Sequence, residues 1–235
     1  MKRVFTALIT VLLGASLIFG IASYLHLSSL QNPPVVATID GTAQTAQGIL
    51  PHAYISLSTY PDSLAGEHGP SGGVHPDWVS YGPSTDITLP AHSLVTMTIT
   101  QYDSGEVLNN PYFAHVWGTV ATPGDGTADG QMLLDGQPVS EVDPEHIGHT
   151  FTLHDLTSPS QDSLFVSVPL PAVDDSLMPD TGYTNTPHVI TFSFITGGAG
   201  HYIWNCEYPC GDGTYKKFGD VMAARAFMSG TVTVA

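Results

Sequence analysis

Short runs rich in Val, Thr, Ile and Phe, closed by Gly, Pro or Asp, recur along most of this chain and constrain its fold more than any other feature. Long apolar helical patterns are few, and the 235 residues include 24 Gly and 18 Pro. Such runs are typical of strands, and closely spaced turns are typical of a sandwich. The sequence therefore predicts one all-β domain with long loops, large enough to bury its own core.

The predicted domain covers residues 75–235 and is expected to be a Greek-key β-sandwich. Its strands are predicted at residues 85–89, 94–101, 114–120, 149–156, 163–168, 188–195, 201–206 and 230–235. The segments 121–136 and 169–187 are polar and Pro-rich, which predicts surface loops. Residues 27–74 predict a linker and an N-terminal extension with one strand at Ala53–Thr59.

The first 26 residues predict the compartment. Lys2 and Arg3 precede an uncharged run, Val4–Ser23, which is about long enough to cross a bilayer as a helix. Since basic residues mark the cytoplasmic end, we expect a single-pass helix in the cell membrane with the C-terminal domain extracytoplasmic. A cleavable signal peptide is the alternative, but the apolar run exceeds a usual signal-peptide core and no clean cleavage site follows it.

The charge pattern argues against one class of partner. Only five residues are basic, and none lies between Arg3 and Lys216, whereas the chain has 21 Asp and Glu and 11 His. Phosphate binding needs clustered cations, so no nucleic-acid partner is expected. An ordinary acidic exterior that maintains solubility and adaptation to an acidic habitat are both consistent with this composition.

The soft metal ligands of the chain gather near its C-terminus. Cys206 ends a Tyr-Ile-Trp strand, Cys210 follows four residues later, and Met228 precedes the last strand. A thiolate and a thioether on neighbouring strands, joined by a Gly-rich loop, suit copper, and especially Cu(I). Met222, in the same loop, is a weaker candidate ligand.

A histidine from an earlier strand is expected to complete this set. His149 opens a strand whose apolar residues alternate inward, which predicts an imidazole at the rim of the sandwich. His146 and His154 flank it and are weaker candidates. The sequence therefore predicts a copper site built from His149, Cys206, Cys210 and Met228, without fixing whether it is mononuclear or binuclear.

Three further residues are expected around these ligands. Trp204 and Tyr208 bracket the first cysteine, where they either pack in the core and loop or form an apolar shell that tunes a redox potential. His115 stands in the predicted strand at residues 114–120 and is expected to donate a hydrogen bond to a ligand.

The order of these motifs resembles the cupredoxin family. The matching motifs are His149–Leu153, a Val/Pro-rich strand, Thr191–Phe194 and then Tyr202–Cys206. This resemblance covers residues 78–235. It implies a cupredoxin-like sandwich in which an early His, a late Cys and a following Met converge on copper.

Within that family, Cys206-x-x-x-Cys210-Gly211 is similar to the binuclear CuA domain of cytochrome c oxidase subunit II. The resemblance implies electron transport at a membrane, with a redox protein or oxidase subunits as partners. One departure is clear: Thr214 stands where that domain has its second histidine, and no histidine follows His201. A standard CuA ligand set therefore cannot be assembled from the matched positions.

Three functional hypotheses follow. The first is a membrane-anchored, copper-binding electron-transfer protein. Its most specific version is a role as subunit II of a terminal oxidase. The second is a metal-free scaffold in which Cys206 and Cys210 form a disulfide, as paired cysteines outside the cytosol often do, and the domain serves as a structural subunit or interaction module. The third is copper delivery or storage. No sequence motif indicates an independent enzyme.

Overall fold

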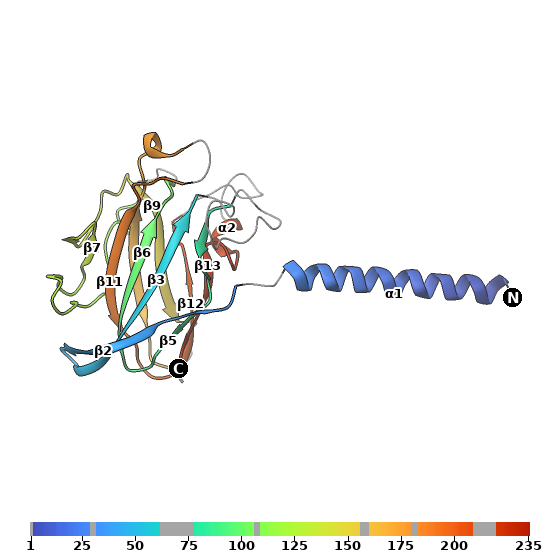
Figure 1. Cartoon of the computed structure of the whole chain (residues 1–235), viewed down its shortest axis with the longest axis horizontal. Helices are drawn as coiled ribbons and strands as arrows, with labels where there is room; N and C mark the ends of the chain where they lie inside the picture. Colours follow the sequence, from blue (N-terminus) through green and yellow to red (C-terminus); the bar gives the residue numbers. More distant parts are fainter. Residues whose placement is uncertain are drawn as a thin grey trace. The chain divides into compact units, whose positions relative to one another are not determined.

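The computed structural model describes residues 2–28, 32–61, 78–105, 109–155, 160–179, 183–208 and 220–235. The chain divides into two units, Met1–Gln31 and Asn32–Ala235. Within the described residues the second unit is built almost entirely of strands (Figure 1). The predicted all-β sandwich is therefore confirmed.

The first unit consists of helix α1, Lys2–Ser28, over the predicted membrane anchor. Apolar side chains along it are exposed, among them Phe5, Leu12 and Phe19. Among the described residues, no helix meets the length and apolarity needed to cross a membrane. Helix formation at the N-terminus is confirmed, and its placement in a membrane stays a prediction.

One layer of the second unit, called sheet A here, carries the predicted ligand strands. Its described strands lie side by side in the order β1-β5-β13-β12-β9-β10. Their bounds are Val35–Val36 (β1), Ile87–Leu89 (β5), Ser229–Val234 (β13), Gly200–Asn205 (β12), Ile147–Asp155 (β9) and Phe165–Pro171 (β10). The three ligand-bearing strands β9, β12 and β13 are therefore neighbours.

The second layer, called sheet B here, runs in the order β2-β3-β6-β11-β7-β8, and β4 pairs with β3 at its side. The bounds of its described strands are Thr38–Thr45 (β2), Gly48–Tyr60 (β3), Ser80–Gly82 (β4), Leu94–Gln101 (β6), Met132–Leu134 (β7), Gln137–Val139 (β8) and His188–Ile195 (β11). Strands β6 and β11 have the predicted ends, and they pair in antiparallel register along their whole length.

The chain passes repeatedly from one layer to the other. It goes from β5 in sheet A to β6 in sheet B, returns for the β9–β10 hairpin, crosses again to β11, and ends with the β12–β13 hairpin. Two short helices lie in the connections, η1 at Asp175–Leu177 and α2 at Asp220–Ala223. Such crossings are those of a Greek-key sandwich.

Aromatic side chains from the inner faces of both sheets meet in the core. Phe151 of β9 stacks on Trp204 of β12 with ring centroids 5.0 Å apart, and it also contacts Phe192 of β11 at 6.0 Å. All three are at most 1% exposed. Aromatic pairs stabilise a fold by more than the burial of their apolar area alone. These contacts therefore help to hold the two sheets together at the inner face of β9 and β12.

Residues 114–120 do not form the predicted strand. The segment makes isolated bridges instead, from His115 to Glu141, from Trp117 to Ser167 on β10 and from Val120 to Ser193 on β11. Because it passes from an edge of sheet A to sheet B, it cannot continue along either ladder. The alternating apolar pattern that suggested a strand therefore reflects a crossing segment.

Two segments contribute more strands than predicted. The loop predicted at 121–136 contains β7, whose Met132 is fully buried and whose Leu133 and Leu134 pair with β11. Residues 35–60, treated above as part of an N-terminal extension, supply β1, β2 and β3, and β3 pairs with β6 in parallel.

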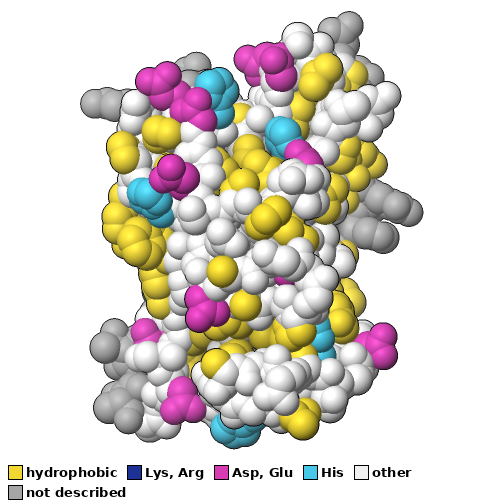
Figure 2. All heavy atoms as spheres, turned by 90° about the vertical axis from the view of Figure 1, so that its left-hand side faces the viewer, with side chains coloured by type: hydrophobic (Ala, Val, Ile, Leu, Met, Phe, Trp, Pro, Cys, Tyr) yellow, Lys and Arg dark blue, Asp and Glu magenta, His cyan; other side chains and the backbone are white. Residues whose placement is uncertain are grey.

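The described surface is strongly acidic. The face in Figure 2 shows Asp, Glu and His side chains among apolar and neutral ones, with no Lys or Arg coloured on it. Among the described residues of the second unit, Arg225 is the only Lys or Arg. Its guanidinium holds the Asp86 carboxylate through Nη2 at 2.7 Å and Nε at 3.3 Å, which lowers the pKa of Asp86 against the opposing effect of burial.

Candidate metal centre

His149 lies near the start of β9 with its side chain turned into the sandwich. Alternation along the strand sends His149, Phe151 and Leu153 inward, and all three are fully buried. The imidazole therefore lies inside the sandwich, not at an exposed rim. Its Nε2 is 2.6 Å from Oδ2 of Asp103, a buried residue that follows β6 in the opposite sheet.

Cys206 immediately follows β12, and its side chain is 1% exposed. The Cys206 sulfur accepts from the His149 ring, and the backbone N–H of Thr150 donates to Sγ at 3.3 Å. Sγ also lies 3.4 Å from the carbonyl oxygen of Tyr208. Since Asp103 occupies Nε2 of His149, Nδ1 is the nitrogen on the side of the thiol.

Met228 faces Cys206 across the last hairpin. The N–H of Cys206 donates to the carbonyl of Met228 at 2.9 Å, next to the paired residues Asn205 and Ser229. Directly opposite residues of an antiparallel pair present their side chains on the same face, so the two sulfur-containing side chains share the inner face of sheet A. Met228 is fully buried, as Cys206 nearly is.

A second hydrogen bond ties the same two strands together beside the thiol. The N–H of Glu207 donates to Oγ1 of Thr150 at 2.8 Å, while the N–H of Thr150 donates to Cys206. The hydroxyl of Tyr81 donates in turn to the carbonyl of Thr150 at 3.2 Å. Thr150 therefore fixes the strand end that carries His149 against the residues that carry the thiol.

The surroundings of His149 change its acid–base chemistry. Burial alone disfavours the charged imidazolium and lowers the pKa, but the hydrogen bonds and negative charge supplied by Asp103 and Cys206 outweigh it. The net effect raises the pKa of His149 from 6.5 to about 9. In the metal-free protein at neutral pH, the ring is therefore an imidazolium between a carboxylate and a sulfur.

The other predicted sulfur ligands lie in the closing loop. Cys210 lies outside the described residues, so its part in a metal site or a disulfide stays a prediction. Met222 belongs to the short helix α2 and is partly buried against the core. Its neighbour Val221 is fully buried, so this helix packs on the sandwich.

The structure does not bring the flanking histidines to the thiol. His146 is in an exposed turn before β9, where its Nδ1 contacts Oδ2 of Asp143 at 3.0 Å. His154 points to the other face of β9, and its Nε2 lies 3.2 Å from Oδ1 of Asn205 and 3.9 Å from the Glu207 carboxylate. Both were weaker candidates, and neither shares the inner face with His149.

Trp204 and Tyr208 are both fully buried around Cys206. The indole N–H of Trp204 donates to the carbonyl of Thr85 at 2.8 Å, and its ring stacks on Phe151 and meets Tyr81 edge-on. Tyr208 is part of the same core cluster. Trp204 therefore packs in the core, and together the two residues keep the thiol away from bulk solvent.

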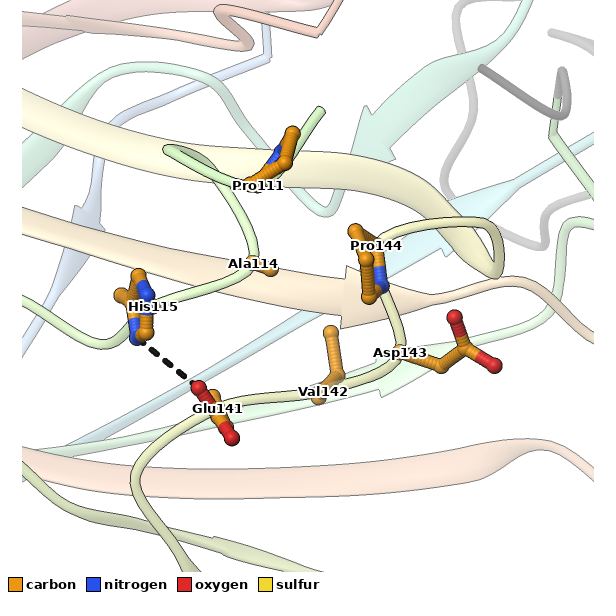
Figure 3. A pocket seen from close by; sticks show the side chains of 7 residues that line it. All are labelled: Pro111, Ala114, His115, Glu141, Val142, Asp143 and Pro144. Carbon is orange, nitrogen blue, oxygen red and sulfur yellow. Dashed lines mark ion pairs between the residues drawn. The ribbon is translucent and has the colours of Figure 1, made fainter. Parts of the chain in front are cut away.

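His115 lies in a separate surface pocket of about 350 Å³, together with Pro111, Ala114, Glu141, Val142, Asp143 and Pro144 (Figure 3). Its Nδ1 is 3.2 Å from Oε2 of Glu141, and both side chains are about half exposed or more. The predicted hydrogen bond from His115 to a ligand is absent from the described contacts, because the ring pairs with Glu141 instead.

Sequence reasoning missed Asp103 and Thr150. Asp103 lies 46 residues before His149, and only the packing of the two sheets brings the pair together. Thr150 directly follows the predicted ligand His149, but only the pairing of β9 with β12 brings its backbone N–H to Sγ of Cys206. Both residues act on the predicted ligands through direct hydrogen bonds.

No family model matches the chain, and no curated protein matches it. Among solved structures, auracyanin B is similar at a TM-score of 0.34 and 13% identity, over 83% of this chain and 96% of that one. Reduced rusticyanin gives 0.34 and 12%, over 83% and 86%. A second structure of rusticyanin, described as a copper protein, gives 0.31 and 11%, over 92% and 94%.

The donor chemistry on the inner face of sheet A fits copper. An imidazole nitrogen, a thiol and a thioether are borderline to soft ligands, and the N–H of Thr150 already points at the sulfur. Among the described residues, no three His, Cys, Asp or Glu side chains are grouped to hold a metal ion.

Proposed function

We propose that this protein binds copper at the end of its sandwich and carries electrons. The support for the proposal is that His149, Cys206 and Met228 are all buried in or next to three adjacent strands of sheet A, with Met228 opposite Cys206 in the last hairpin. Bound copper would supply a one-electron couple there. Its ligands from the described residues would be Nδ1 of His149, Sγ of Cys206 and Sδ of Met228, and Cys210 is the proposed further sulfur ligand.

The described contacts suit a site that changes little between oxidation states. Strand pairing fixes the backbone on both sides of Cys206, and Thr150 links it to the strand of His149. The N–H that points at Sγ would withdraw charge from a metal-bound thiolate. Because His149, Met228, Trp204 and Tyr208 are fully buried, bulk water has little access to the ligands.

We further propose that the domain works outside the cell membrane, with α1 as its anchor and a redox protein or oxidase subunit as its partner. The support is the order of Lys2 and Arg3, the uncharged run Val4–Ser23 and then the all-β unit. A role as oxidase subunit II rests on the spacing of Cys206 and Cys210 alone. The location is tested by adding a membrane-impermeant protease to intact cells, which should cleave the domain if it lies outside the membrane.

Copper loading of the full chain, purified anaerobically, tests the binding function. With the bound copper oxidised to Cu(II), the proposal predicts a visible thiolate charge-transfer band. Cys206→Ser should abolish the band and His149→Gln should strongly weaken it, because each variant removes one ligand from the ion. His201→Gln is the matched control, since His201 is exposed at the start of β12. A colourless wild type in which Cys206 and Cys210 are found disulfide-bonded would contradict copper binding and favour the scaffold hypothesis.

A further inference from the structure

Asp103 is the one described residue that contacts the far nitrogen of His149. Its Oδ2 lies 2.6 Å from Nε2, and the side chains of Asp103 and His149 are 8% and 0% exposed. We propose that Asp103 is a positioning residue of the copper site, holding the imidazole so that Nδ1 faces Cys206 and adding a buried negative charge behind the metal. This inference rests on the proposed copper function.

The backbone of Asp103 is held by its own network. Its carbonyl accepts the N–H of Val173 at 3.1 Å and Nε2 of the buried Gln101 at 3.1 Å. The Gln101 side-chain oxygen accepts the hydroxyl of Thr59 from β3, and the N–H of Tyr102 donates to the Thr59 carbonyl at 3.1 Å. These bonds fix where the carboxylate stands, so the position of the imidazole is set by sheet B as well as by its own strand.

Two glycines let the Asp103 segment approach β9. Gly105 has φ +65°, and a Cβ added there would lie 2.4 Å from Cα of Gly148, the residue directly before His149. A Cβ on Gly148 would lie 2.9 Å from Nε2 of Gln101 and 3.3 Å from Cα of Ala172. Neither contact leaves room for a side chain. The sequence therefore has Gly at both points where the carboxylate-bearing segment crosses the strand of its histidine.

A carboxylate at this place has two consequences for a bound metal. It accepts the Nε2 proton of a neutral imidazole, which selects the tautomer with Nδ1 available as ligand. Its negative charge also stabilises the more positive copper ion, so it favours Cu(II) over Cu(I) and lowers the reduction potential. A neutral acceptor would give the first effect without the second.

Two variants separate these effects, and a third is the control. Asp103→Asn keeps an oxygen that can accept the Nε2 proton but removes the charge, and Asp103→Leu removes both. Asp135→Asn is matched, because Asp135 holds His188 at 2.7 Å in a half-exposed pair that contacts none of the proposed ligands. Each full-length variant is loaded with copper. Its affinity is measured by competition with a Cu(I) chelator, and its potential by redox titration.

We expect Asp103→Asn to raise the reduction potential while copper still binds, and Asp103→Leu to weaken copper binding about 10- to 100-fold. Histidine ¹⁵N spectra of the Cu(I) forms should show a proton on Nε2 of His149 in the wild type and in Asp103→Asn. In Asp103→Leu that proton signal should be lost to exchange. Asp135→Asn should match the wild type in all three measurements.

Two results would overturn the inference, and they can be told apart from failure of the proposed function. Suppose that the wild type binds copper, that Asp103→Asn has the same reduction potential as the wild type, and that Asp103→Leu has the same copper affinity as the wild type. Asp103 then does not position or tune the site. A proton on Nδ1 of His149 in the Cu(I) form would overturn the assignment as well. If the wild type binds no copper, the proposed function itself fails.

Discussion

Two histidine–carboxylate pairs in this sandwich have nearly the same length and opposite surroundings. Asp103 and His149 are 2.6 Å apart and buried, whereas Asp135 and His188 are 2.7 Å apart with side chains 47% and 32% exposed. Both join residues far apart in the sequence. The difference shows that hydrogen-bond length alone does not say what such a pair does.

Burial decides how much each pair matters. An exposed ion pair contributes about 0–1 kcal/mol because water screens it and each side chain is already well solvated. A buried pair has lost its water, so removal of one partner leaves the other uncompensated and costs about 3–5 kcal/mol. The buried pair holds a titratable ring in one orientation, and its surroundings raise the pKa of His149 to about 9.

Removal of each carboxylate gives the largest expected contrast. Asp103→Ala should lower the free energy of unfolding of the metal-free protein by about 3–5 kcal/mol, since His149 is left buried without its anion. Asp135→Asn, which removes the charge and tolerates the left-handed φ of +51° at this position, should lower it by about 1 kcal/mol or less. Urea denaturation of the two variants at neutral pH measures both values. Equal losses would remove the distinction drawn from burial.

The pH dependence of stability sharpens the comparison. Because folding raises the pKa of His149 from 6.5 to about 9, its stabilising contribution is fully present below pH 6.5 and is lost as the pH rises through 9. The loss should be on the order of 3 kcal/mol. Urea denaturation of the metal-free protein between pH 6 and 10 measures it, and NMR titration of the His149 ring gives the midpoint. A midpoint near 6.5 would contradict the predicted coupling to Asp103.

The smallest expected effect concerns the crossing glycines. Gly105→Ala and Gly130→Ala place Ala at similar positive φ values, +65° and +75°, but only Gly105 lies against another backbone. In both variants the left-handed backbone conformation should lower the free energy of unfolding by about 1–2 kcal/mol. In Gly105→Ala, overpacking against Gly148 should lower the free energy of unfolding by about 1–3 kcal/mol more. Equal stabilities of Gly105→Ala and Gly130→Ala would show that the Asp103 segment can shift to accommodate the added methyl group.

The central strands of the sandwich could be predicted from sequence, but several edge strands and the hydrogen-bond partners of the proposed ligands could not. Residues 94–101 and 188–195 alternate with period two, so their ends were predicted correctly. Residues 114–120 show similar apolar spacing but cross between layers, and periodicity does not distinguish a crossing segment from a paired strand. Pairing depends on the three-dimensional path of the chain.

The same limit applies to the candidate site. Residue types and spacing predicted His149, Cys206 and Met228 as ligands, and the structure places all three in or next to neighbouring strands of one sheet. Asp103 has no local pattern that marks it, because a single carboxylate after a strand is common in polar turns. It becomes recognisable only once β6 and β9 are known to face each other across the core.

The position of Asp103 after a strand of sheet B, opposite a ligand in sheet A, has a consequence for assembly. The β9, β12 and β13 ladder can form within its own layer, but the imidazole gains its carboxylate partner only when the two layers dock. Copper added before the two sheets have docked would reach the sulfur ligands while the His149 ring is not yet held in one orientation. The histidine proton shared with Asp103 is therefore a spectroscopic reporter of complete layer closure, and loading is best timed after that signal appears.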